Sequence, residues 1–133
     1  FRPDSAGPGR SRGGVGQTMI FENAGTSTIH ARVRPDKITC APPGINGGRN
    51  GSTGEVWFNG EQIHQFPILD FAPGDRIELR MPGGAGFGPV EERPTDLILE
   101  DLRKGVITAE GAVRDYGLGP EDIPNGQVGK ESM

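Results

Sequence analysis

The sequence is poor in the residues that build disulfides, metal clusters and large apolar cores. It has one cysteine, two histidines and one tryptophan, and hydrophobic residues make up 32% of its 133 residues. A single cysteine, Cys40, excludes an intrachain disulfide and a Cys-based zinc cluster and is typical of a reducing compartment, so we expect a cytoplasmic protein. No apolar run approaches the roughly 18 residues that a membrane-spanning helix needs, and no signal peptide is evident.

The net charge restricts the possible partners, and the glycine content bears on the expected fold. The formal net charge of −4 argues against nucleic acid or an anionic membrane surface as a partner. The chain has 23 glycines and 12 prolines, yet short apolar blocks at regular intervals predict folded β-structure. Because so small an apolar core contributes little net stability, we expect docking onto another chain. Since the chain begins with Phe1 and not with Met, we also expect it to be part of a longer polypeptide.

Alternating apolar and polar residues predict a mainly β fold, a small sheet or barrel-like domain. Strands are expected over residues 17–22 and 28–34, paired through a turn at 23–25. A hairpin is expected over 56–66, because Asn59-Gly60 supplies the two positive φ angles of a type I′ turn. Residues 76–80 alternate again and predict a further strand.

Three glycine-rich segments separate these strands, at residues 1–16, 41–54 and 82–89. In the second segment glycine recurs every three residues, at Gly48, Gly51 and Gly54. Three residues is the period of polyproline II, and glycine at every third place allows such segments to pack side by side. The alternative interpretation of the second segment is a flexible linker.

The pattern changes to a helical one after Pro94. Thr95 can cap a first helix that Gly105 ends, and Thr108 can cap a second short helix that Gly117 ends. Residues 119–133 mix proline, glycine and charge without a period. We therefore expect one domain over residues 1–118 and a tail over 119–133 that is either mobile or lies across another subunit.

Four blocks of the sequence resemble the hydantoinase B/oxoprolinase family in order and spacing. The stretch DSAGPGRSRGG, residues 4–14, is similar to the family's DSGGxGRxRGG motif, with Ala6 in place of a glycine. Residues 42–49 resemble its Pro-Pro-Gly to Gly-Gly-Arg block, and residues 73–88 resemble its Pro-Gly-Asp to glycine-rich block. Residues 101–117 resemble the closing helices, which end in Tyr-Gly.

The resemblance implies one part of an ATP-dependent, multisubunit enzyme that hydrolyses a cyclic amide or carboxylates a ketone. It implies an ATP-binding hydantoinase A-like partner that carries ATP and Mg, and an upstream part of the same catalytic subunit that holds a divalent metal. Neither the Walker A pattern nor a strand–GxGxxG–helix unit occurs here, so we expect no cofactor on this chain alone. The alternative is a noncatalytic assembly module that clamps the larger subunits together.

Candidate ligand-binding residues lie in the first block. Arg10 and Arg12 stand beside four glycines, and guanidinium groups with bare backbone amides suit a phosphate or carboxylate; Ser5 belongs to the same motif. The alternative is that the arginines form ion pairs and the glycines serve packing only. His30 and His64 lack a second metal-ligand residue at suitable spacing. Cys40 has no catalytic partners in the pattern and is expected to be a buried small apolar residue.

Overall fold

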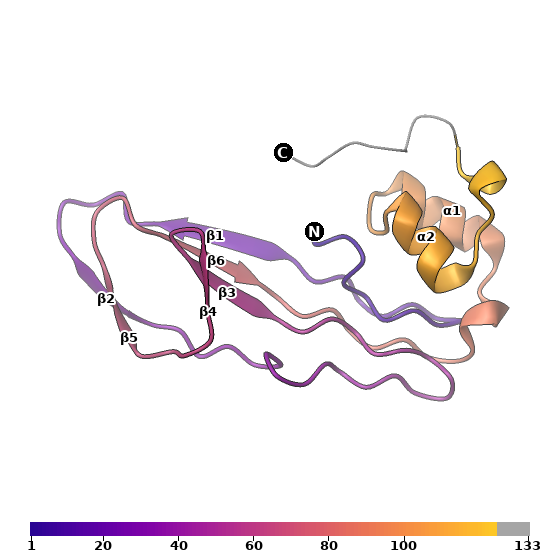
Figure 1. The fold of residues 1–133 in the computed structure, drawn as a ribbon, viewed down its shortest axis with the longest axis horizontal. Helices are drawn as coiled ribbons and strands as arrows, with labels where there is room; N and C mark the ends of the chain where they lie inside the picture. The colour runs from indigo at the N-terminus through magenta and orange to yellow at the C-terminus, as the bar shows by residue number, and fades with distance from the viewer. Residues whose placement is uncertain (125–133) are drawn as a thin grey trace.

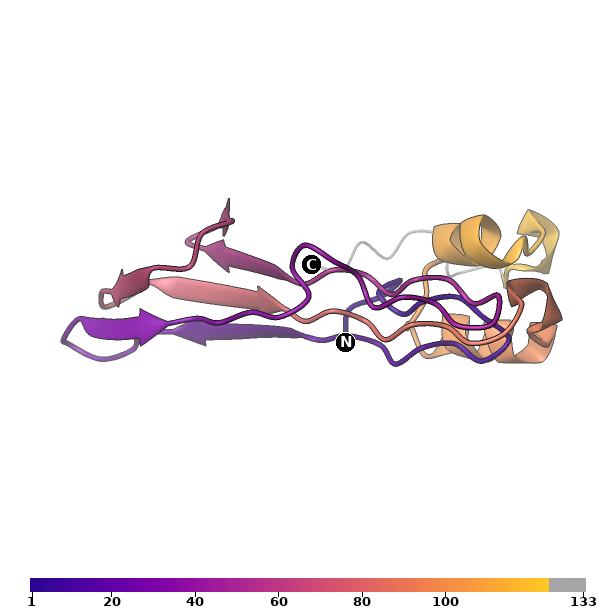
Figure 2. The ribbon, with the colours of Figure 1, turned by 90° about the horizontal axis from the view of Figure 1, so that it is seen from below.

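The computed structural model describes residues 1–124 as an elongated molecule with β-sheets at one end and helices at the other (Figure 1). Glycine-rich segments connect the two ends and run side by side along the long axis (Figure 2). We call residues 1–16, 41–54 and 82–89 together the glycine bundle. The predicted mainly β fold with two short C-terminal helices is confirmed.

Six strands form two antiparallel sheets. The larger sheet has the order β1-β6-β3-β4, and the smaller sheet pairs β2 with β5. Their bounds are β1 Thr18–Glu22, β2 Ile29–Arg32, β3 Glu55–Phe58, β4 Glu61–Ile63, β5 Ile68–Phe71 and β6 Arg76–Arg80. Alternate residues of the two sheets face one apolar core, whose buried centre is Val56, Phe71 and Ile77, as the two-residue period requires.

The predicted hairpin at Asn59-Gly60 is confirmed, and the predicted pairing of the first two strands is wrong. β3 pairs with β4, and both turn residues have positive φ, 49° at Asn59 and 81° at Gly60. β1, however, pairs with β6, whereas β2 pairs with β5. Asn23 explains the difference, because its buried side-chain amide donates to the carbonyl of Phe71 at 2.8 Å and fixes the crossing between the sheets.

The glycine bundle is held by hydrogen bonds between segments that lie far apart in the sequence. Gly7 N donates to Gly84 O at 2.7 Å, and Ser52 N donates to Ser5 O at 2.9 Å. A Cβ atom built at Gly48 would meet the carbonyl of Gly86, so the backbones approach too closely for any side chain. The close packing predicted from the three-residue period is therefore observed at Gly48, and the linker interpretation is wrong.

Two helices, α1 (Thr95–Arg103) and α2 (Ala109–Tyr116), close the chain beyond the bundle. Thr108 caps α2 as predicted, since its hydroxyl oxygen accepts from Gly111 N at 2.9 Å. Gly117 ends α2 in the left-handed conformation, with φ 66°. Thr95 is not a cap but the first residue of α1, because Pro94 occupies the N-cap position without a side-chain hydrogen bond.

The helical end has an apolar cluster of its own, separate from the core of the sheets. Its buried members are Ile98, Leu102, Ile107, Ala112 and Leu118. Short 3₁₀ turns stand before and after the helices at Val90–Glu92 and Pro120–Asp122, and Ile123 packs against the cluster. The predicted tail lies mostly outside the described residues. No helix within residues 1–124 has both the length and the apolar character to cross a membrane.

Candidate functional site

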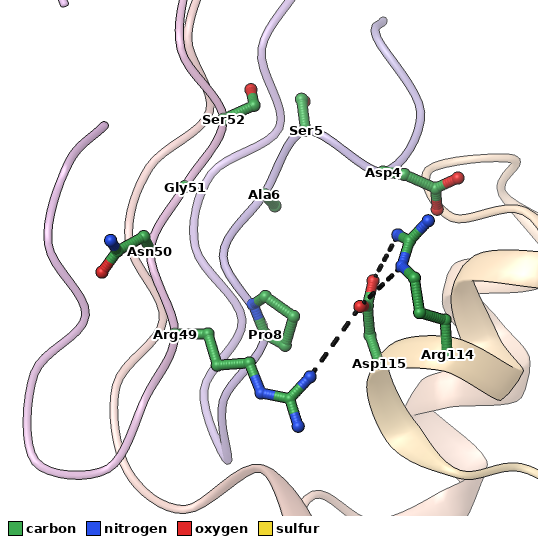
Figure 3. Close-up of a pocket in the computed structure, with 10 residues that line it drawn as sticks. All are labelled: Asp4, Ser5, Ala6, Pro8, Arg49, Asn50, Gly51, Ser52, Arg114 and Asp115. Carbon is green, nitrogen blue, oxygen red and sulfur yellow. Dashed lines mark hydrogen bonds and ion pairs between the residues drawn. The ribbon is translucent and has the colours of Figure 1, made fainter. Parts of the chain in front are cut away.

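A polar hollow lies between the glycine bundle and helix α2 (Figure 3). Three of the four sequence blocks described above contribute to its lining, although they are far apart along the chain. The lining residues are Asp4, Ser5, Ala6, Pro8, Arg49, Asn50, Gly51, Ser52, Arg114 and Asp115.

Asp4 fixes the helical end of this hollow. It adopts a left-handed φ of 59°, which a non-glycine residue rarely does unless its surroundings compensate. Its carboxylate accepts from Thr108 N at 2.8 Å and from the Thr108 hydroxyl at 2.6 Å, at the start of α2. Both carboxylate oxygens are therefore engaged in joining the bundle to the helix, where the helix dipole also favours negative charge.

Ser5 links the two ends of the first glycine-rich segment. The residue is 2% exposed, and its hydroxyl donates to Arg2 O at 2.6 Å while it accepts from Gly16 N at 2.8 Å. These two bonds use the only hydrogen of the hydroxyl and one of its lone pairs, and the side chain acts here as a clamp between the two ends of the segment.

Arg12 belongs to a largely buried ion cluster around Asp101 of α1. Its guanidinium donates to both oxygens of Asp101, at 2.9 and 3.2 Å. Arg93 donates to the same carboxylate at 2.7 Å, and Arg93 and Asp101 have side chains only 7% and 5% exposed. Burial raises the pKa of the neighbouring Tyr116 hydroxyl, and the charge of Arg93 opposes that shift. The cluster attaches the helices to the bundle.

Arg10 lies at the surface, apart from Arg12. It forms an exposed ion pair with Glu92 at 3.2 Å and stands over the ring of Phe87 at 5.7 Å. Neither arginine lines the hollow, and of the three candidates only Ser5 does. Their proposed role in ligand binding stays a prediction, and the observed contacts match the alternative in which both arginines form ion pairs.

Sequence reasoning missed the charged residues that do meet at the hollow: Arg49, Arg114 and Asp115. Arg114 donates to Asp115 through two bonds at 2.9 and 2.7 Å, and the Arg49 guanidinium lies 3.9 Å from the same carboxylate. Figure 3 shows the two arginines reaching Asp115 from opposite sides, one from the bundle and one from α2. All three lie in blocks that resemble the family, and that resemblance is the sequence feature that could have identified them.

The remaining candidates lie at the sheet end. His30 on β2 bonds Asp70 on β5 at 2.8 Å, and both side chains are highly exposed; His64 is also exposed. Cys40 is exposed, so the expectation of a buried small residue is wrong. Within the part of the chain that the structure describes, no group of three or more His, Cys, Asp or Glu side chains is arranged to hold a metal ion.

Known proteins share this fold. The crystal structure of an ATP-dependent caprolactamase from Pseudomonas jessenii matches 94% of the chain with a TM-score of 0.67 and 24% identity, over 22% of its own length. The nucleotide-free structure of an acetone carboxylase matches 92% of the chain with a TM-score of 0.64 and 19% identity. The fold is thus that of one segment within the subunits of large enzymes.

The chain belongs to the hydantoinase B/oxoprolinase family, whose sequence model matches residues 1–90. An uncharacterized protein of Methanocaldococcus jannaschii is 35% identical over 123 residues, 87% of this chain. The caprolactamase subunit beta of Pseudomonas jessenii is 30% identical over 125 residues, 86% of this chain. In both cases the chain spans only 21% of the relative's length.

Proposed function

We propose that this chain is the C-terminal module of a catalytic subunit in an ATP-dependent enzyme that hydrolyses a cyclic amide or carboxylates a ketone. The observation that carries the proposal is the hollow, because three separate blocks that resemble the family converge on it. A functional site typically brings together residues from distant parts of the sequence.

The proposal assigns the chemistry that needs ATP and metal to other parts of the assembly. ATP and Mg would bind a hydantoinase A-like partner, and a divalent metal would bind the upstream part of the catalytic subunit. The described residues do not fit a metal role of their own, since they offer no three-ligand cluster. In this assembly, which we expect in the cytoplasm, the module supplies the polar wall of a site that other chains complete.

The first test is native mass spectrometry of the protein isolated from its source, with identification of every co-migrating chain. The proposal expects a complex that contains an ATP-binding subunit and the sequence that precedes this module in its relatives. A stable lone chain of 14.1 kDa would contradict it.

A second candidate function, a noncatalytic clamp between larger subunits, is favoured by strand β1. This strand forms one edge of the larger sheet, and its side chains Ile20 and Phe21 are 47% and 51% exposed. An unprotected apolar edge strand is a site where a further strand can add. The clamp function needs this edge and makes no use of the hollow.

Arg49→Ala in the reconstituted complex separates the two functions, because Arg49 lines the hollow with an exposed side chain, and Arg10→Ala tests the predicted ligand role of Arg10. Arg12 is a poor probe because its partner Asp101 is buried, whereas the pair of Arg10 with Glu92 is exposed. If the hollow forms a wall of the reacting site, Arg49→Ala lowers turnover while the complex stays intact, and Arg10→Ala does the same if Arg10 contacts the reacting group. If the module is only a clamp, kcat is unchanged and any effect appears in the association constant.

A further inference from the structure

The hollow between the bundle and α2 has a surplus of hydrogen-bond donors. Its acceptor side chains are engaged: the Asp4 carboxylate by Thr108, the Asp115 carboxylate by Arg114, and the Asn50 carbonyl by Gly44 N at 2.9 Å. The donors that remain belong mainly to Arg49 and Arg114, whose guanidinium groups carry five N–H donors each. A ligand that fits this hollow must therefore bring acceptors and negative charge.

Arg49 is held in place by its backbone, and within residues 1–124 its side chain forms only a long ion pair with Asp115. Arg49 N donates to Pro8 O at 2.7 Å and Arg49 O accepts from Gly86 N at 2.9 Å, so the residue is fixed within the bundle. The side chain is 56% exposed, and its guanidinium lies 3.9 Å from the Asp115 carboxylate, which is beyond hydrogen-bond distance. Among the described residues the guanidinium has no hydrogen-bonded acceptor, in contrast to those of Arg10 and Arg12.

Arg114 faces the same hollow from α2. It is bound in a bidentate pair to Asp115, which is 18% exposed and so remains rigidly placed. One carboxylate thus lies against two guanidinium groups, and the start of α2 favours the negative charge of Asp4. The two arginines balance the two aspartates of the lining, and the exposed side chain of Arg49 places its positive charge on the open side of the hollow.

We propose that Arg49, supported by Arg114, binds an oxyanion in this hollow, namely the carboxylate or phosphate group of a small molecule. The planar fork of a guanidinium matches two oxygens of either group, and such charge-assisted bonds are about twice as strong as neutral ones. The site is distinct from the predicted ligand residues Arg10 and Arg12, and it does not depend on the enzymatic function proposed above.

The test is a titration of the 133-residue chain with inorganic phosphate and, separately, with acetate, at constant ionic strength. Chemical shifts of the arginine Nε–H groups and of the Ala6 and Gly51 amides report on the hollow. We expect saturable binding and a loss of affinity of about tenfold in Arg49→Gln, since one charge-assisted contact accounts for about that factor. Arg49→Lys keeps the positive charge but loses the planar guanidinium, so its affinity should lie between those of the unmodified chain and of Arg49→Gln.

Arg76→Gln is the matched control, because Arg76 is an exposed arginine at the start of β6, at the sheet end. It should bind as the unmodified chain does. Stronger binding of phosphate assigns a phosphoryl ligand, and stronger binding of acetate assigns a carboxylate. The proposal is overturned if neither anion saturates, or if Arg49→Gln binds as tightly as Arg76→Gln. Since no partner subunit is present, failure of the enzymatic proposal would not affect this result.

Discussion

The glycine bundle and the two sheets hold the same chain together by different means. The bundle uses hydrogen bonds between backbones and almost no apolar side chains, whereas the sheets bury the apolar core around Val56, Phe71 and Ile77. A sheet needs only an apolar pattern at the right period, but in the bundle each position is fixed by the atoms of its neighbours. This difference explains why the segments that form the bundle are so rich in glycine.

Glycine is required for different reasons in the bundle and in the sheets. At Gly13 a Cβ atom would meet the carbonyl of Gly84, so that position excludes side chains by lack of space. At Gly60 the Cβ would meet no atom within 4 Å, but φ is 81°. The bundle therefore requires glycine for packing, whereas the hairpin requires it for backbone conformation.

The largest expected effect comes from Gly13→Ala. Because the added methyl group would overlap backbone that cannot move aside, we expect a loss of more than about 3 kcal/mol in the free energy of unfolding, or failure to fold. The measurement is urea unfolding followed by circular dichroism.

The adjacent Gly14→Ala is the matched control for this substitution. A Cβ at Gly14 meets nothing within 4 Å and its φ is not positive, so the variant should change stability by no more than about 0.5 kcal/mol. Equal losses in Gly13→Ala and Gly14→Ala would contradict the packing explanation of the bundle.

The next largest effect is expected for Asp101→Ala at the join of bundle and helices. The substitution leaves Arg93, whose side chain is 7% exposed, without the carboxylate it bonds at 2.7 Å. Removing one partner of a buried ion cluster costs about 3 kcal/mol. Glu100→Ala on the same helix removes only an exposed pair with Lys104 and should leave unfolding almost unchanged. A small effect of Asp101→Ala would show that the cluster does not attach the helices.

The part of the fold that sequence reasoning predicted is the part governed by short-range rules. Asn59-Gly60, Thr108 and Gly117 act within a few residues of themselves, and all three predictions are confirmed. The pairing of β1 with β6 is different, because it joins residues such as Phe21 and Ile77 that are far apart along the chain. No turn signal encodes that partner, and the nearby turn residues favoured a wrong hairpin.

The candidate site, like the fold, could not be predicted from sequence where the contacts join residues far apart along the chain. The first block predicted an anion site at Arg10 and Arg12 because of their glycine neighbours, yet their acidic partners Glu92 and Asp101 lie about eighty to ninety residues away. Arg49 stood in a recognised block, but only the three-dimensional structure shows that, among the described residues, its guanidinium has a long ion pair and no hydrogen-bonded acceptor. The sequence blocks thus indicated the region of the candidate site, and the contacts in the structure showed which of its arginines lie at the hollow.

A smaller effect is expected where the bundle meets the larger sheet, at Glu55. Burial raises the pKa of Glu55, but the hydrogen bond from Trp57 and the charges of Arg2 and Arg80 outweigh it, so its pKa lies below the ordinary value. A depressed pKa contributes stability above the unfolded-state pKa, and that stability is lost as pH falls through the folded-state pKa. Glu55→Gln should therefore cost about 1 kcal/mol at neutral pH, because partial exposure screens the pairs.

The test of this junction is urea unfolding of Glu55→Gln and of the unmodified chain at neutral pH and at about pH 3. The difference in stability between the two proteins should shrink as the pH is lowered. Glu61→Gln, at an exposed position on β4, is the matched control. A difference that persists at low pH would mean that Glu55 acts through packing rather than through its charge.

The smallest effect on stability, and the sharpest contrast with Gly13→Ala, is expected for Ile20→Lys on β1. Ile20 is 47% exposed, so the isolated chain should lose no more than about 0.5 kcal/mol. A lysine on an edge strand opposes the addition of another strand, and association with the other chains of the complex should therefore weaken. Size-exclusion chromatography with the co-purified subunits measures this effect, with Val113→Lys on α2, an exposed apolar residue at 40% that lies on no strand edge, as the control. Weakened association in Ile20→Lys alone would show that the sheet end is completed by a partner strand, whereas intact association would leave the glycine bundle and the helices as the surfaces that other chains contact.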